Sequence, residues 1–215
     1  PDGDEFIFSE VRAGTKILNN TAALSGGGIN VEGALRIVGP DIEVSGNIAT
    51  ARVGGGVAST GILDRVSGVV FDNNEASQGG GLYVTRDLTL SDSTFVNNLA
   101  EFGGGLHTAG ANGAATEVTD TRFLNNRLKT DANEDSTGSA LFTRTGELVV
   151  TQSCFVNNEG VAAANDSSDA ASAIENWWGA ASGPRPNIGL GDEVDGNFNV
   201  LPFLSAPILD CPTRN

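Results

Sequence analysis

The sequence predicts an all-β protein, a right-handed parallel β-helix of about six coils that ends in an irregular C-terminal cap. Three observations support this prediction. A short element ending in Asn recurs six times, a glycine-rich element recurs in phase with it, and apolar and polar residues alternate between the two. No segment shows the apolar period of an amphipathic helix, so we expect short strands with one buried face.

The asparagine element sets the length of each coil. It reads "ILNN", "VSGN", "FDNN", "FVNN", "FLNN" and "FVNN" in chain order, and its closing asparagines are 27, 27, 24, 28 and 32 residues apart. A unit of this size with about three short strands cannot bury its apolar face alone, so it must stack on its neighbours. Parallel connections are almost always right-handed, which gives the expected hand of the helix.

The glycine element marks a turn in each coil. It occurs at residues 26–29, 54–57, 79–82 and 103–106 as "GGGI", "GGGV", "GGGL" and "GGGL". A degenerate "GSAL" at 138–141 is delayed by the insertion "RLKTDANED". Glycine adopts positive φ and lets the backbone turn without a Cβ clash, so we place corners of the coils at these positions.

Stacked coils put equivalent side chains above one another at about 4.8 Å, the spacing of paired strands. We therefore expect one internal aromatic stack and one internal ladder of amides that hydrogen-bond from coil to coil. The stack would consist of Phe71, Phe95, Phe123 and Phe155, and the ladder of Asn74, Asn98, Asn126 and Asn158.

Composition divides the single domain into coils at 1–175 and a capping segment at 176–215. The capping segment holds most of the prolines and both tryptophans. Proline cannot donate to a strand ladder, so this segment is poor strand material. We expect Trp177 or Trp178 to cover the apolar opening of the last coil. Cys154 and Cys211, which are the two cysteines of the chain, are expected to form a disulfide between the cap and the last regular coil.

The paired "GGG[IVL]" and "FxxN" elements resemble the repeats of polymorphic outer membrane proteins and of autotransporter-passenger β-helices. The segment "NWWGAASGP" at 176–184 is similar to an element that closes many secreted β-helix repeat domains. The resemblance implies a secreted or cell-surface protein with an adhesive or structural role. It carries no catalytic residue across, because these motifs belong to the scaffold.

Charge limits the possible partners. The chain has 27 acidic and 12 basic residues, a net charge of −15, so a nucleic acid would be repelled. No apolar run is long enough to span a membrane. The N-terminal strand edge carries no capping device, so either upstream coils of a longer protein or another subunit could pair with it. Head-to-tail stacking of copies would form open fibres.

The sequence offers little to a catalytic mechanism. The single histidine, His107, follows a glycine triplet, and its place in the alternation predicts an outward, exposed ring. Candidate outward charges are scattered over different corners and are expected to be solvated turn residues: Asp72, Asp87, Asp92, Asp120, Arg86 and Arg122. We therefore expect no enzyme, although polysaccharide lyases and hydrolases share this fold.

Two acidic loops are candidate calcium sites. The first, within the insertion, places Asp131, Asn133 and Asp135 at alternate positions. The second, "GDEVDGNFN" at 191–199, offers Asp192, Asp195, Asn197 and Asn199. Hard oxygen ligands suit calcium, but both loops depart from a complete calcium loop, so a plain polar turn is the alternative.

The function expected from the sequence is that of a structural or adhesive β-helix on a cell surface, or of a subunit of an extracellular filament or sheath. Its partners would be other copies of itself, other surface proteins or glycans. The alternative is a protein that binds or cleaves carbohydrate along one face of a sheet. No cofactor is expected apart from structural calcium.

Overall fold

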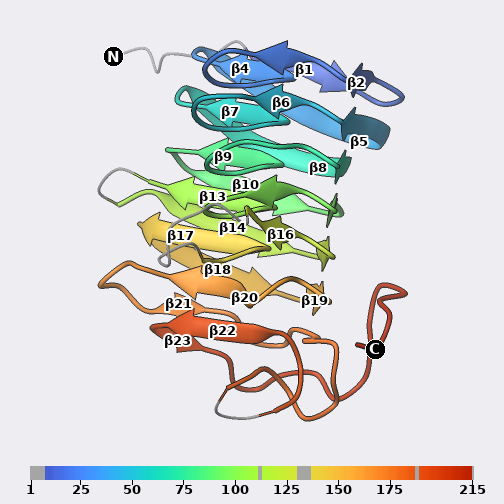
Figure 1. Ribbon diagram of the computed structural model, residues 1–215, viewed down its shortest axis with the longest axis vertical. Helices are drawn as coiled ribbons and strands as arrows, with labels where there is room; N and C mark the ends of the chain where they lie inside the picture. The colour runs from blue at the N-terminus through green and yellow to red at the C-terminus, as the bar shows by residue number, and fades with distance from the viewer. Residues whose placement is uncertain (1–7, 111–112, 130–136, 187–188, 215) are drawn as a thin grey trace, which may run out of the picture.

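The computed structural model describes residues 8–110, 113–129, 137–186 and 189–214. In these residues the chain forms a parallel β-helix of about six coils, stacked along one axis from the N-terminal end to the C-terminal end (Figure 1). Every pairing between strands in the described part of the chain is parallel. The described residues contain no helix, and so none that could cross a membrane. The predicted fold class is confirmed.

The largest sheet bends around a corner and forms two sides of the stack. We call them the first side and the second side. Two long strands turn the corner without a break, β5 (Ala34–Ser45) and β8 (Ile62–Asp72). The first side continues with β1 (Ser9–Arg12), β10 (Leu88–Ser91), β14 (Ala115–Thr119), β18 (Glu147–Thr151), β21 (Ala171–Ser172) and β23 (Phe198–Asn199). The second side continues with β2 (Lys16–Leu18), β11 (Thr94–Val96), β15 (Arg122–Leu124) and β19 (Cys154–Val156).

The third side is a separate sheet of seven strands. It consists of β4 (Ile29–Val31), β7 (Val57–Ser59), β9 (Leu82–Val84), β13 (Leu106–Ala109), β17 (Leu141–Thr145), β20 (Val161–Asn165) and β22 (Glu193–Gly196). Short pairs join the second side to the third: β3 (Thr21–Ala22) with β6 (Ile48–Ala49), and β12 (Leu99–Ala100) with β16 (Arg127–Leu128).

The corners form where the sequence places residues that tolerate a left-handed backbone. Asp92 and Asp120 have φ of 50° and 48° between the first and second sides, and Asn97 and Asn125 have φ of 56° and 53° after the second side. Asn and Asp are the non-glycine residues that most readily adopt this conformation. The first asparagine of each "NN" pair therefore turns the chain and leaves the second free for the interior.

The glycine triplets meet two different requirements. Gly79, the first of its triplet, has φ of 61°. Gly81, the third, has φ in the ordinary range, but a Cβ there would lie 2.7 Å from the carbonyl oxygen of Gly105 and 2.8 Å from the ring of Phe95. The triplet thus combines a corner with a close approach between coils, because only glycine leaves room for the neighbouring backbone.

The core is one narrow apolar column. Phe71, Phe95, Phe123 and Phe155 are fully buried and stack in register, with ring centroids 4.6, 5.1 and 4.9 Å apart and ring planes within 12° of parallel. Trp178 extends the stack at 4.5 Å from Phe155. Val44 pairs with Phe71, and Ile17 with Val44, so aliphatic residues continue the column into the first coils.

Parallel pairing continues past the boundary expected at residue 176. β22 pairs with β20, and β23 with β21, so the cap contributes strands of its own. Beyond β22, the backbone of Arg185 pairs with Asp192 and Val194. The neighbouring Pro184 and Pro186 have no N–H to donate, so they close this edge to further strands.

Candidate functional site

The amide ladder is the most regular polar feature of the interior. The backbone N and Nδ2 of Asn74 both donate to Oδ1 of Asn98, at 3.0 and 3.1 Å. Asn98 makes the same pair of bonds to Asn126, and Asn126 to Asn158. Each ladder Nδ2 also donates to a backbone carbonyl of the preceding coil, such as that of Phe71 from Asn98. The ladder also includes Asn20 and Asn47, which were not predicted to belong to it.

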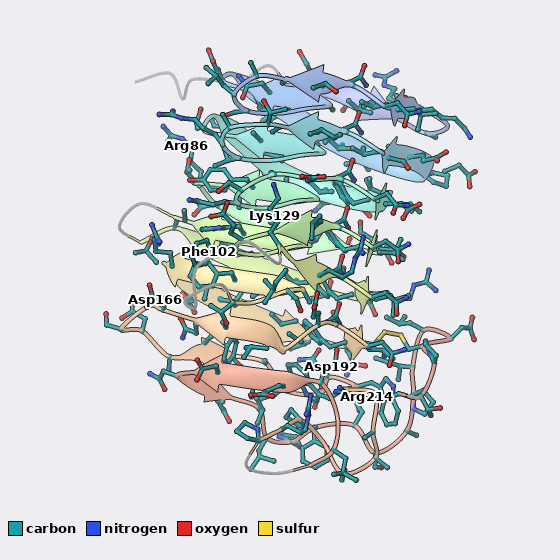
Figure 2. The ribbon with its side chains drawn as sticks, viewed as in Figure 1. Arg86, Phe102, Lys129, Asp166, Asp192 and Arg214 are labelled. Atoms are coloured by element: carbon teal, nitrogen blue, oxygen red, sulfur yellow. A yellow bond between two sulfur atoms is a disulfide. The ribbon has the colours of Figure 1, made fainter. Side chains whose placement is uncertain are left out.

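The ladder has a direction and ends in a carboxylate. Asn158 donates through its backbone N and Nδ2 to Oδ2 of Asp192, at 2.9 and 2.8 Å. Arg214 donates to the other oxygen, Oδ1, at 3.1 Å. Figure 2 shows the two labelled side chains side by side near the C-terminal end of the stack. A carboxylate accepts hydrogen bonds but has none to donate, so the ladder stops at Asp192.

Asp192 therefore has a role inside the protein that the calcium prediction did not include. Its side chain is fully buried and protein donors occupy both oxygens, whereas Asp195 and Asn197 of the same predicted site are exposed. Burial raises the pKa of the Asp192 carboxyl, and the hydrogen bonds from Asn158 and the charge of Arg214 oppose that rise. The other candidates, Asp131, Asn133 and Asp135, lie outside the described residues. Nowhere in the described ranges do three or more His, Cys, Asp or Glu side chains gather as a metal site.

The C-terminal tail folds back along the second side. Cys154 and Cys211 are joined in a disulfide that spans 57 residues of sequence. Trp177 packs with this pair, and its Nε1 donates to the carbonyl of Pro212. Arg122 donates to the carbonyl of Leu209. The two tryptophans therefore differ: Trp178 ends the internal stack, and Trp177 anchors the tail on the outside.

The prediction for His107 is wrong in one respect. Its ring points outward from β13 as expected, but it is fully buried. It lies between Tyr83 and Phe142 of the neighbouring coils, at centroid distances of 5.2 and 4.9 Å, and neither ring nitrogen has a hydrogen-bond partner among the described residues. Burial, and next the charge of Arg144, lower the pKa of His107 to about 3. A neutral buried ring of this kind is unsuited to act as a general base.

A polar groove lies over the first-side strands β8, β10, β14 and β18 and over the turns that lead into them from the third side. It consists of two adjoining cavities of about 550 and 500 Å³ that share Asp64 and Asp87. We define the groove by the six charged residues that line it: Asp64, Arg65, Arg86, Asp87, Glu117 and Glu147. Its four carboxylates come from four successive coils, one from each.

Strand pairing fixes the positions in the groove. Thr89 pairs with Arg65 on one side and Glu117 on the other, and Ala115 pairs with Glu147. Asp87 accepts a hydrogen bond from the backbone N of Ala115, and Asp64 forms an ion pair with Arg36 at 2.9 Å. Arg65, Arg86, Glu117 and Glu147 are exposed, and none has an ion-pair partner within the described part of the chain.

The sequence had singled out only two groove residues, Asp87 and Arg86. The other outward candidates lie elsewhere, since Asp72 accepts from Asn73 and Asn97, Asp92 accepts from Ser67, and Asp120 is a corner residue. The groove has no repeating motif, because its carboxylates occupy different positions within their coils. The signal that could have revealed it is one acidic residue just before, or among the first three residues of, each of four successive first-side strands.

Part of the chain is similar to a known family of repeats. Residues 68–85 match the model of the Chlamydia polymorphic membrane protein repeat. They run from the end of β8 to the residue after β9 and contain one asparagine element and one glycine triplet. No curated protein and no solved structure matches the chain. The repeat and the β-helix together fit a surface-associated protein similar to outer membrane proteins of this kind.

Proposed function

We propose that the chain is a secreted or cell-surface β-helix with a structural and adhesive role, which holds a polar side of a rigid stack toward a partner. The observation that carries this proposal is the match of residues 68–85 to a surface-protein repeat within a continuous parallel stack. The disulfide between Cys154 and Cys211 supports it, because disulfides persist in oxidising compartments outside the cytosol.

The internal contacts favour a rigid presenting surface. The stacked rings occupy four successive coils, the amide ladder runs through the same coils, and both are buried. Fully satisfied polar networks of this kind hold a unique arrangement. The outer residues of the first side are therefore held at fixed positions on paired strands, as an adhesive surface requires.

Other surface molecules are better partners than a second copy of the chain. In head-to-tail stacking, Asp192 would have to donate to the ladder of the next copy, and an ionised carboxylate has no hydrogen to donate. Pro184 and Pro186 flank the same end. We therefore favour glycans or other surface proteins over a filament of this chain, and the net charge of −15 argues against nucleic acid.

The alternative function is carbohydrate binding or cleavage, and the carboxylates of the groove favour its binding form. For cleavage, two carboxylates must be held at opposite faces of one sugar bond. Here Asp64 and Asp87 are engaged by Arg36 and Ala115, and His107 is buried. The two exposed carboxylates, Glu117 and Glu147, lie on neighbouring strands and line the same face of one sheet. We propose that the protein has no enzymatic activity and needs no cofactor.

An adhesion assay tests the proposal. Beads coated with the full chain are applied to cultured epithelial cells, and heat-denatured chain on matched beads is the control for non-specific attachment. We expect the folded chain to raise attachment well above the control. Equal attachment of both kinds of bead would refute the adhesive role, and release of reducing sugars from a polysaccharide panel would refute the non-enzymatic one.

A further inference from the structure

We propose that the polar groove binds a neutral polysaccharide, laid along the axis of the stack. The inference rests on the proposed adhesive function and assigns it a site and a class of ligand. It follows from three properties of the groove: its length across the coils, the charges it leaves unpaired, and the rigidity of its strands.

The groove is elongated along the stack. It crosses four coils, from Asp64 in β8 to Glu147 in β18. With about 4.8 Å between paired strands, these coils cover about 14 Å. An open groove of this length suits a segment of an extended polymer better than a compact small molecule, which would leave most of the lining in water.

The unpaired charges select the chemistry of the polymer. Arg65 and Glu117 flank Thr89 on adjacent strands, and neither forms an ion pair with a described residue. The acidic chain attracts a cationic peptide, but within the groove such a peptide would meet Arg65 and Arg86 beside the carboxylates and could not pair with the acidic side chains without facing like charge. An anionic polymer would be repelled by the carboxylates and by the net charge of −15. A hydroxyl group donates to a carboxylate and accepts from a guanidinium, so a chain of hydroxyl groups satisfies both signs at once.

The strands hold the groove in place before a ligand arrives. Asp87 is fixed by the N–H of Ala115, and Asp64 by Arg36. Pre-formed sites spend less binding energy on ordering their side chains. Among the residues that the structure describes, no aromatic side chain lines the two cavities, so hydrogen bonds supply the affinity. We therefore expect weak binding by a single chain, strengthened when many chains are displayed together.

Nuclear magnetic resonance on the full chain tests the site. The probes are neutral hexasaccharides of glucose and of mannose, with oligolysine and polygalacturonate as the cationic and anionic alternatives. At least one neutral hexasaccharide is expected to shift the backbone amides of Thr89, Ala115 and Glu117 in a saturable way at millimolar concentration. Failure of every neutral probe to shift them would overturn the proposal, as would binding of oligolysine or polygalacturonate alone.

Two charge-removing variants test the two-sign argument. Glu117→Gln and Arg65→Gln keep the approximate side-chain shape, and each is expected to weaken binding of the neutral probe about tenfold, since each removes a charge-assisted hydrogen bond. A cationic ligand would instead bind Arg65→Gln more tightly, and an anionic one would bind Glu117→Gln more tightly. Either increase contradicts the proposal.

Asp166→Asn is the matched control. This exposed residue lies just after β20, away from the groove lining, and its substitution removes one charge. We expect unchanged binding of the neutral probe. A tenfold loss in this variant as well would show that the net charge, and not the groove, governs binding, and would overturn the assignment of the site.

The failure of this inference can be told apart from the failure of the proposed function. If beads coated with the Arg65→Gln and Glu117→Gln variants adhere as well as wild-type beads, the adhesive role stands but the groove is not its site. Wild-type beads that do not adhere, although the soluble chain binds a neutral hexasaccharide through the groove, would remove only the adhesive role.

Discussion

Adjacent asparagines in one motif serve different purposes. Asn97 turns the corner with positive φ, and its side chain donates to Asp72 near the surface. Asn98 is fully buried, accepts two bonds from Asn74 and donates to Asn126 and to the carbonyl of Phe71. The motif therefore combines a backbone requirement and an interior hydrogen-bond requirement in two successive residues.

Substitution of the two asparagines should separate these roles. Asn98→Leu removes the acceptor of the buried Asn74 backbone N–H and of one Nδ2 hydrogen of Asn74, and it removes the donor to Oδ1 of Asn126 and to the carbonyl of Phe71. We expect a loss of about 3–5 kcal/mol in the free energy of unfolding. Asn97→Gly keeps the left-handed backbone and should cost about 1 kcal/mol or less. Urea unfolding followed by circular dichroism measures both, and equal losses would contradict the assigned roles.

His107 gives the protein a pH dependence of its own. Its pKa is about 3 when folded and near 6.5 as an unperturbed side chain, so the unfolded state binds a proton first as the pH falls. The stability supplied by the neutral ring is complete above 6.5 and declines between 6.5 and 3. Between pH 7 and pH 5 we expect a loss of about 2 kcal/mol from this residue.

His107→Phe is the matching variant, because Tyr83 and Phe142 occupy the same column. Its unfolding free energy should change less than that of the wild type between pH 7 and pH 5, by about 2 kcal/mol. The measurement is urea unfolding at the two pH values. Parallel pH profiles for the two proteins would show that the ring titrates normally, and so is not buried.

The roles of residues that recur from coil to coil could be predicted from the sequence. The roles of residues that occur only once could not. Phe95 and Asn98 were predictable because equivalent residues recur at the spacing of one coil. Alternation placed His107 outward, but it cannot reveal that Phe142 and Tyr83 cover that position. Asp192 lies 34 residues after Asn158 and outside any asparagine motif, so only the structure shows that it ends the ladder.

At the scale of elements, the C-terminal tail is held by the disulfide more than by strand pairing. Its residues Leu204, Ile208 and Leu209 pack beside Cys154, Val156 and Trp177, in a small apolar cluster separate from the main core. Such a satellite cluster buries little area by itself. The covalent bridge should therefore contribute much of the stability of this region.

Removal of the bridge tests that view. Cys154→Ser with Cys211→Ser opens a loop of 57 residues, and chain-entropy arguments give a loss of about 4 kcal/mol. Thermal unfolding gives the overall effect, and fluorescence quenching reports exposure of Trp177. Thr213→Ala, an exposed substitution in the same tail, is the control. An unchanged melting temperature in the double variant would mean that packing alone holds the tail.

At the scale of the whole molecule, one coil is a unit that can be removed. Phe95 pairs with Phe71 and Phe123 in register, so deleting residues 75–98 would bring Phe123 onto Phe71. Stability in such arrays is close to a sum over units and their contacts. The shortened chain should fold with a lower melting temperature and keep its β-sheet circular dichroism signal.

Deletion of residues 75–86 removes only half a coil. Unlike deletion of residues 75–98, it breaks the register between the coils that remain. A strand shifted out of phase turns its apolar side chains to solvent, so this variant should not fold. The comparison uses thermal unfolding and circular dichroism. Folding of both variants, or of neither, would contradict a stack built from equivalent coils.

The equivalence of the coils also has a consequence for the evolution of the gene. A recombination event between two matching positions in the gene would add or remove an entire turn of the rod without disturbing the residues on either side. The number of coils would then differ between related proteins, while the cross-section of the stack and the C-terminal tail stayed the same. A family of such molecules would differ mainly in the length of the stack.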